Sequence, residues 1–221
     1  MINPVSFTRT IPIYHIVDYR NLQQIIDLKG LFCKSYLVNQ GIINIDIAQP
    51  GIQERRFKFK VPVCKKGFLS DYVPFYFANR SPMLFSIHTK NVVSYNGSQT
   101  NIIYLVSSVQ KIYQSQLKCC YTDGHATIRF TDFFDDLSKL EDSIDWEIIS
   151  SWSWHDTDED ENRKRKKQAE FLVHHFVPWN LVEKIAVIDP IMKQKVESII
   201  AESEYQYNPS VEIRRNWYYD S

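Results

Sequence analysis

This sequence has few glycines, few cysteines and no net charge. Its 221 residues include six glycines and four cysteines, and 26 basic side chains balance 26 acidic ones. A chain without net charge has no global field, so any site for an anion or a nucleic acid must be a local patch. The cysteines form no C-x-x-C pair, and adjacent Cys119 and Cys120 are poorly placed for a disulfide. We therefore expect a reducing, cytoplasmic location.

Long apolar runs are absent as well. Nowhere do about eighteen apolar residues follow one another, as a membrane-spanning helix requires. The N-terminus lacks the apolar centre of a signal peptide. A chain of 221 residues with 44% hydrophobic content can bury a substantial core. No internal repeat or low-complexity linker divides it, so we expect one monomeric domain over residues 1–221, without contact with a membrane.

Hydrophobic periodicity predicts a mixed fold. We expect strands at residues 11–17, 73–77, 100–109, 119–123, 169–178, 181–188 and 211–219. Helices are expected at residues 22–28, 133–140, 143–149 and 192–200, with another beginning at Pro82. Asp18 is the expected N-cap of the first helix and Gly30 its stop. Residues 32–60 show little regular pattern apart from a possible short helix from Gln53, which is typical of a lid or binding loop.

A carboxylate opens one of the apolar runs. The run A-E-F-L-V-H-H-F-V-P covers residues 169–178. Glu170 lies at the entrance of this strand, and Gln168 shares its face because side chains alternate along a strand. Such a carboxylate can be an ordinary rim residue that meets water or a base. It can also stabilise the oxocarbenium character that develops when a ribose–nicotinamide bond breaks.

Isolated histidines and arginines have both functional and structural interpretations. His15 lies in a strand that leads into a helix, where a lone histidine is more often structural. Arg80 precedes a helix start, which disfavours a cation unless an anion is near, so we expect a phosphate contact. His125 is expected to be a surface turn residue. His174 and His175 face opposite sides of a strand, and neither has a carboxylate or cysteine at ligand spacing, so no metal site is expected.

An acidic run at residues 156–161 is followed directly by the basic run Arg163-Lys164-Arg165-Lys166-Lys167. One interpretation is a solvent-exposed helix with acids at its start and bases at its end, which complements the helix dipole. The other is a site for single-stranded nucleic acid, with phosphates on the basic side chains and bases stacked on Trp152 and Trp154. Composition leaves both open.

Several short motifs occur in a fixed order along almost the whole chain. They are I-P-I-Y-H-I at residues 11–16 with Asn21-Leu22, I-Q-E-R-R at 52–56, D-Y-V-P-F-Y-F at 71–77, R-S-P-M-L at 80–84, L-V-S-S at 105–108, Thr122-Asp123, K-K-Q-A-E-F-L-V at 166–173, P-W-N-L at 178–181 and W-Y-Y at 217–219. Each motif is weak alone. As an ordered set they resemble DarT, the family of DNA ADP-ribosyltransferase toxins of bacterial toxin–antitoxin systems.

The resemblance implies an α+β fold of the ADP-ribosyltransferase type, with a split central β-sheet, flanking helices and an NAD cleft between the two halves. NAD would be the substrate, and no metal would take part. A loop at residues 38–58 would fold over NAD, and the region 127–170 would present the DNA. The residues expected to contact NAD are His15, Ile16, Val17, Gln24, Phe32, Arg56, Tyr76 and Met83. Relatives often have threonine where this chain has Val17, so a hydroxyl contact is lost there while backbone contacts survive.

The resemblance also assigns the catalytic and DNA-binding roles. Glu170 would be the catalytic carboxylate. Arg56 would touch the NAD phosphates and assist proton removal from the target base; because a guanidinium rarely deprotonates, we interpret it as an orienting and charge-stabilising group. The residues expected to contact DNA are Arg80, Ser81, Pro82, Met83, Leu84 and Phe85 by resemblance, and Trp154, Arg163, Lys164 and Arg165 from the basic run.

The predicted activity is therefore transfer of ADP-ribose from NAD to a base of single-stranded DNA, with thymine the favoured base. Two alternatives stay open. The same fold could modify guanine in DNA, or RNA or protein, or the chain could be a non-catalytic module that binds single-stranded nucleic acid. A toxin of this type is expected to have a macrodomain antitoxin (DarG) as its partner.

Overall fold

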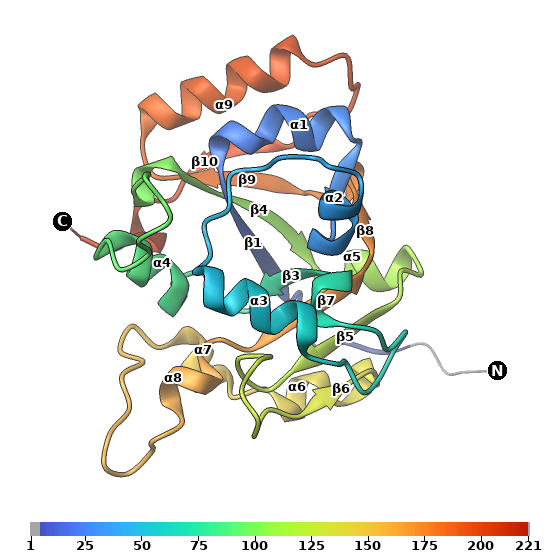
Figure 1. The fold of residues 1–221 in the computed structure, drawn as a ribbon, viewed down its shortest axis with the longest axis vertical. Coiled ribbons are helices and arrows are strands. Elements are labelled where there is room, and N and C mark those ends of the chain that lie inside the picture. The colour runs from blue at the N-terminus through green and yellow to red at the C-terminus, as the bar shows by residue number, and fades with distance from the viewer. Residues whose placement is uncertain (1–4, 221) are drawn as a thin grey trace.

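An eight-stranded sheet with the order β10-β9-β4-β1-β3-β7-β5-β6 forms the centre of the molecule (Figure 1). The computed structural model describes residues 5–220. The strands are β1 (Pro12–Asp18), β3 (Tyr72–Tyr76), β4 (Ile102–Ser108), β5 (Cys119–Thr122), β6 (Phe133–Phe134), β7 (Glu170–His174), β9 (Lys184–Val187) and β10 (Ser210–Ile213). Neighbours are antiparallel except β9 and β10, which are parallel. A separate two-stranded sheet joins β2 (Gly30–Phe32) to β8 (Phe176–Pro178).

The large sheet is split between β1 and β3. These strands share one register pair, Tyr14 with Tyr76, whereas β1 and β4 pair along seven residues. Beyond Tyr14 the two halves diverge, so side chains of β1 and of β3 and β7 can face a common space. On the other side of β3, Tyr76 is paired with Glu170 of the neighbouring strand β7. The split therefore brings the first strand and the predicted catalytic carboxylate to one place.

Helices cover both halves of the sheet. They are α1 (Leu22–Asp27), α2 (Lys34–Asn39), α3 (Pro50–Lys58), α4 (Pro82–His88), α5 (Val109–Gln114), α6 (Leu140–Ser143), α7 (Trp146–Ser150), α8 (Arg163–Lys166) and α9 (Pro190–Glu202). Short 3-10 helices lie at Tyr19–Asn21, Leu69–Asp71, Gln99–Asn101, Leu137–Lys139, Trp179–Leu181 and Arg215–Trp217. In Figure 1, α1 and α9 lie side by side over the β9–β10 end, and α3 crosses in front of the split. Within residues 5–220, no helix has the length and apolarity to cross a bilayer.

Most of the predicted strands and the predicted start of α4 are confirmed. The strands expected around residues 11–17, 73–77, 100–109, 119–123 and 181–188 correspond to β1, β3, β4, β5 and β9. Asp18, expected as the N-cap of the first helix, caps instead the 3-10 turn Tyr19–Asn21 that leads into α1, by accepting from the Arg20 amide; α1 itself has no side-chain cap. Pro82 occupies the first turn of α4, whose N-cap Ser81 accepts from the Leu84 amide. The sequence was sufficient to predict these helix starts because the preferences for cap residues and proline act over three or four residues.

Three regions differ from expectation. Residues 32–60 are not irregular, because they contain α2 and α3, and the short helix expected from Gln53 begins earlier, at Pro50. The helix expected at residues 133–140 is wrong: Phe133 and Phe134 form edge strand β6, and a 3-10 turn follows. The edge strand expected at 211–219 is confirmed only as β10, which ends at Ile213. In each case, pairing or packing with distant residues overrides the local pattern.

Backbone conformation explains two further differences. Gly30 does not stop the first helix; Lys29 adopts the left-handed conformation (φ 63°) and Gly30 opens β2. A Cβ on Gly30 would lie 2.2 Å from the Val177 carbonyl oxygen, so the strand pairing itself requires glycine. The run 169–178 is two strands, β7 and β8, because His175 takes a positive φ of 68° between them.

Asp18 anchors the turn between β1 and the first helix. Its carboxylate is fully buried and accepts from the Arg20 amide, from Arg20 Nε and Nη2 at 2.8 and 2.7 Å, and from Tyr95 Oη at 2.6 Å. Burial raises the pKa of Asp18, but the hydrogen bonds from Arg20 and Tyr95 outweigh it and leave the pKa below its ordinary value. The carboxylate is thus ionised in the folded protein.

We expect Asp18→Asn to lower the free energy of unfolding by about 2 kcal/mol at neutral pH, because an amide cannot accept all of these bonds and leaves a buried donor unmatched. Since the pKa is lowered on folding, this stabilisation is present above about pH 4 and is lost as the pH falls through the folded-state pKa. Urea denaturation at several pH values measures the difference. Asp27→Asn, on the exposed face of α1, is the control, and an equal loss in both variants would contradict the prediction.

Candidate active site

A cavity of about 430 Å³ occupies the split in the sheet. Its walls come from β1, β3, α1, α2, α3, α4 and the loop before β7. Its polar end lies around Glu170 and includes Arg56, Tyr76, His125, Lys164 and Gln168. The rest of the lining mixes apolar side chains, such as Ile25, Leu28 and Ile47, with polar ones, such as Asn21 and Gln24. A cavity with apolar walls and a few convergent polar groups is typical of a ligand site.

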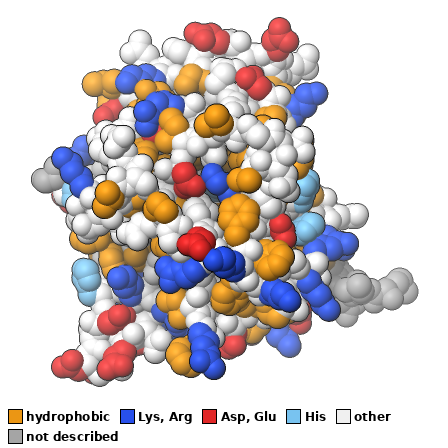
Figure 2. All heavy atoms as spheres, in the orientation of Figure 1, with side chains coloured by type: hydrophobic (Ala, Val, Ile, Leu, Met, Phe, Trp, Pro, Cys, Tyr) orange, Lys and Arg blue, Asp and Glu red, His pale blue; other side chains and the backbone are white. Residues whose placement is uncertain are grey.

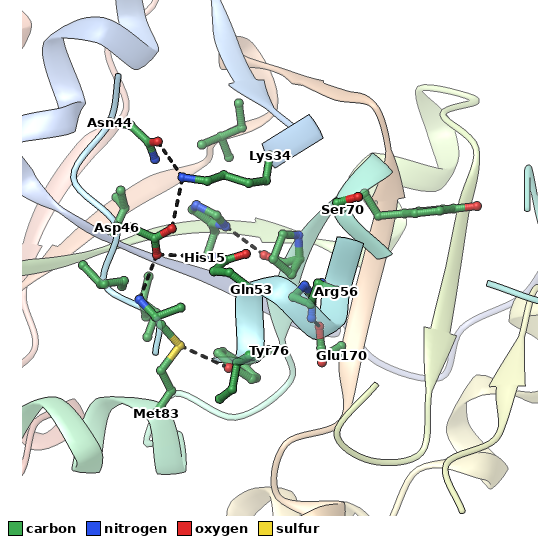
Figure 3. Close-up of a pocket in the computed structure, with 18 of the residues that line it drawn as sticks. His15, Lys34, Asn44, Asp46, Gln53, Arg56, Ser70, Tyr76, Met83 and Glu170 are labelled. Carbon is green, nitrogen blue, oxygen red and sulfur yellow. Dashed lines mark hydrogen bonds and ion pairs between the residues drawn. The ribbon is translucent and has the colours of Figure 1, made fainter. Parts of the chain in front are cut away.

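Arg56 and Glu170 form a buried ion pair at the polar end (Figure 3). Arg56 Nη1 donates to Glu170 Oε2 at 2.8 Å, and the two residues are only 9% and 2% exposed. The arginine comes from the last turn of α3, and the glutamate is the first residue of β7. Within the described residues, the buried Arg56 Nη2 has no hydrogen-bond partner. Such an atom costs free energy unless a bound ligand satisfies it.

The segment before β6 wraps around Glu170. The Ala126 amide donates to Glu170 Oε1 at 3.0 Å, and the Glu170 amide donates to the Thr122 hydroxyl at 3.1 Å. Thr122 in turn donates to the Gly124 carbonyl. With Arg56 on Oε2 and Ala126 on Oε1, each carboxylate oxygen has a donor. The charge of Glu170 is therefore fixed in position before any substrate arrives, as electrostatic catalysis requires.

Two histidines line the cavity, and the sequence suggested only one of them. His15 Nδ1 lies 2.8 Å from the Pro74 carbonyl, so it carries the proton and Nε2 is left as an acceptor. His125, predicted as a surface turn residue, lines the cavity instead. The Thr127 amide donates to His125 Nδ1, which leaves Nε2 as a donor. Burial lowers the pKa of both histidines, so both imidazoles are neutral near pH 7.

Tyr76 and Met83 close the polar end on the side of α4. Tyr76 Oη donates to Met83 Sδ at 3.4 Å. Burial and the nearby Glu170 charge raise the pKa of Tyr76, so the phenol stays protonated. Ile16, Val17, Gln24 and Phe32 also line the cavity. All the residues predicted to contact NAD are thus brought together, although they come from six separate segments of the chain.

A stretch of extended chain, residues 43–48, covers the cavity between α2 and α3; we call it the strap. Within residues 5–220, no main-chain hydrogen bond joins the strap to another main-chain group. Side chains hold it instead. Asn21 makes two bonds to the main chain of Ile45, at 2.8 and 2.9 Å, and Gln24 donates to the Ile43 carbonyl. The strap is therefore attached by side-chain hydrogen bonds, which can be exchanged for hydrogen bonds to other partners.

The residues predicted to contact DNA fall into two groups around the polar end. In and before α4, Ser81, Pro82 and Leu84 are buried, while Met83 and Phe85 are partly exposed. The Arg80 guanidinium lies between the rings of Trp152 and Tyr219, at 4.2 and 4.4 Å from their centroids. Trp154 is 4% exposed and donates to Tyr219 Oη, whereas Trp152 is 64% exposed. Of the two tryptophans, only Trp152 presents a ring to solvent.

The basic run forms the short helix α8, and its members have different surroundings. Lys164 lines the cavity. Arg165 pairs with Asp123 at 3.0 Å, and Lys166 pairs with Asp145 and Asp160. Lys167 is buried, donates to the carbonyls of Ile149 and Ser151, and has its pKa lowered to about 8 by burial. Because α8 covers only Arg163–Lys166, the prediction of a single helix across the acidic and basic runs is wrong.

Gln168 precedes β7, and its amide nitrogen bonds the Lys164 carbonyl at 3.0 Å. It lines the cavity beside Glu170, although it does not share a strand with it. Figure 2 shows basic side chains gathered across the face over α3 and α8, and acidic side chains at the tip of the loop below them. Zero net charge requires any anion or nucleic-acid site to be a local patch, and this basic face is such a patch.

Several polar lining residues were not predicted individually, and they include Lys34 of α2, Asn44 and Asp46 of the strap, and Gln53 of α3. Their positions depend on contacts between these three segments, and no single motif specifies such contacts. No group of three metal-binding side chains occurs among residues 5–220.

The fold and the site define a class. The split sheet, with a buried carboxylate at the start of β7 facing a cleft beside β1, is the arrangement of ADP-ribosyltransferases. Within that class, residues 14–219 match the family described as "ssDNA thymidine ADP-ribosyltransferase, DarT". The chain belongs to the DarT family.

Curated relatives and solved structures agree with this. A DNA ADP-ribosyl transferase of Thermus aquaticus is 42% identical over 94% of this chain and 88% of that protein, and one of Escherichia coli is 31% identical over 94% and 93%. The structure of Thermus sp. 2.9 DarT in complex with ADP-ribosylated ssDNA matches with a TM-score of 0.87 and 40% identity, covering 95% of this chain and 96% of that one. The same protein in complex with NAD+ matches with a TM-score of 0.82 and 36% identity, covering 97% and 100%.

Proposed function

We propose that this protein transfers ADP-ribose from NAD to thymine in single-stranded DNA and releases nicotinamide. The single observation that carries the proposal is the buried Arg56–Glu170 pair at the polar end of the cavity, in a chain of the DarT family. A non-catalytic binding module has no need to bury a carboxylate and a guanidinium beside a cleft, because such a pair stabilises a fold little compared with apolar residues.

NAD would lie in the cavity with its adenosine against the apolar part of the lining and its nicotinamide ribose beside Glu170. His15, Ile16, Val17, Gln24 and Phe32 would contact it from β1, α1 and β2, and Tyr76 and Met83 from the opposite wall. The neutral His15 can accept a hydrogen bond through Nε2, and Arg56 Nη2 can donate one to an NAD oxygen. The strap and α3, within residues 38–58, would cover the bound dinucleotide.

Glu170 would stabilise the positive charge that develops on the ribose as the bond from its anomeric carbon to the nicotinamide nitrogen breaks. Nicotinamide leaves as a neutral molecule with the electron pair of that bond. The thymine N3 loses its proton to solvent and forms the new bond to the anomeric carbon. Arg56 would orient the base and stabilise its developing negative charge.

Single-stranded DNA would approach along the basic face shown in Figure 2. Arg80, Met83 and Phe85 would form one side of its path, and Arg163, Lys164 and Arg165 the other. The buried Ser81, Pro82, Leu84 and Trp154 would support these side chains rather than present a surface of their own. As a member of a toxin family acting on DNA in the cell, the protein would have a macrodomain antitoxin (DarG) that removes the modification.

Mass spectrometry of oligonucleotides after incubation with NAD tests the proposal. We expect a thymine-containing single strand to gain one ADP-ribose, with one nicotinamide released per adduct. The same strand without thymine, its duplex, an RNA of the same sequence and a protein mixture serve as controls. An adduct on the thymine-free strand would point to guanine or another base instead. Binding of the strand without nicotinamide release would contradict an enzymatic function.

A further inference from the structure

Two of the three cations that line the cavity are paired with anions before a ligand binds, and the third, Lys164, makes no ion pair among residues 5–220. Arg56 is neutralised by Glu170 at 2.8 Å. Lys34, from the first turn of α2, is neutralised by Asp46 of the strap, with 3.0 Å between Lys34 Nζ and Asp46 Oδ2. The diphosphate of a dinucleotide brings two further negative charges. A charge entering a partly buried site needs a cation with good geometry, or it is excluded.

Asp46 can lose Lys34 without being left unpaired. Its other oxygen, Oδ1, accepts from the Ala48 amide at 2.9 Å and from Gln53 Nε2 at 3.2 Å. Its side chain is also 34% exposed, so water can replace the lysine. The Lys34 side chain is 24% exposed and its other partner is the neutral Asn44 Oδ1 at 2.9 Å. The ammonium can therefore exchange one anion for another at little cost.

Lys34 also has a suitable position along the cavity. In Figure 3, Lys34 and Asp46 lie between Asn44 on one side and the Arg56–Glu170 pair on the other, close to His15. Arg56 and Glu170 suit the reacting ribose, and apolar lining residues such as Ile25 and Leu28 suit an adenine ring. The diphosphate connects these two parts of NAD, so a cation that binds it has to lie in the cavity wall, as Lys34 does.

We propose that Lys34 binds the diphosphate of NAD, and that Asp46 holds the lysine in position until the dinucleotide replaces it. The proposal rests on the proposed function for the identity of the dinucleotide. It assigns to α2 and the strap a specific part of donor binding: a carboxylate of the protein occupies the place that a phosphate takes later. Exchange of partners would couple NAD entry to movement of the strap, which has only side-chain attachments.

Calorimetric binding of ADP-ribose and of adenosine tests the assignment, because the first ligand contains the diphosphate and the second does not. We expect Lys34→Met to weaken ADP-ribose binding about tenfold or more and to leave adenosine binding within about twofold. Asp46→Asn is expected to strengthen ADP-ribose binding about threefold, since Lys34 no longer has a competing anion. In kinetics, Lys34→Met should raise the KM for NAD with kcat nearly unchanged, as for a group that binds substrate and transition state equally.

Lys193→Met is the matched control, because Lys193 pairs with Glu197 on α9, outside the cavity. Unchanged ADP-ribose affinity in Lys34→Met would overturn the proposal. So would an equal loss for ADP-ribose and adenosine, since Lys34 would then only hold the strap. Weaker ADP-ribose binding by Asp46→Asn would refute the role of Asp46. Failure of the unchanged protein to bind ADP-ribose at all would count against the proposed function instead.

Discussion

Glu170→Gln is expected to reduce ADP-ribose transfer to single-stranded DNA by a hundred- to a thousandfold, on the order of what one well-placed electrostatic group contributes. The amide keeps an oxygen for the Ala126 amide, which donates to Oε1 at 3.0 Å. It removes the negative charge next to the reacting ribose. Because that charge matters most when the ribose becomes cationic, kcat should fall far more than the affinity for ADP-ribose.

Loss of folding must be separated from loss of chemistry in this variant. Glutamine leaves the Arg56 guanidinium without its carboxylate, and breaking a buried pair costs about 3–5 kcal/mol when one partner is removed. Far-UV circular dichroism and ADP-ribose binding therefore accompany the activity measurement. Glu54→Gln, on the exposed side of α3, is the control for the same chemical change. Near-normal transfer by folded Glu170→Gln would remove the mechanism.

The fold was predictable in the parts that local chemistry determines. Asp18, Ser81 and Pro82 mark helix starts through contacts within four residues. Strand β4 was predictable because its sequence is a nearly continuous apolar run, and the structure buries every residue of it. The edge strand β6 was missed because two phenylalanines at 133 and 134 fit a helix equally well. Only pairing with Thr122 and Tyr121 of β5 makes them a strand.

The residues of the candidate site were predictable where a short sequence pattern marks them. Glu170 was indicated by a carboxylate at the head of an apolar run, and Arg56 by the I-Q-E-R-R motif that it ends. Lys34, Asp46 and His125 carry no such sign. Their positions follow from the packing of α2, the strap and the loop before β6 against the split sheet, and no short stretch of sequence specifies that packing.

Arg56→Lys separates the charge of the arginine from its shape. A lysine can still pair with Glu170, so we expect the free energy of unfolding to change by no more than about 1 kcal/mol. In Arg56, Nη1 donates to Glu170, and Nη2 has no partner among the described residues and is free for a ligand. A lysine at this position lacks such a second donor in the plane of the first. Transfer to DNA should therefore fall about a hundredfold although the protein is as stable as before.

Arg56→Met completes the comparison, because it removes the charge as well and leaves Glu170 buried without its cation. This variant should lose about 3–5 kcal/mol of stability in addition to activity. Arg55→Lys, one residue away on the exposed face of α3, controls for the arginine-to-lysine change. Denaturant titration and the rate of adduct formation, measured on all three variants, decide between the roles. If Arg56→Lys transfers ADP-ribose at the normal rate, a positive charge beside Glu170 is sufficient. The planar guanidinium would then have no part in placing NAD or the base.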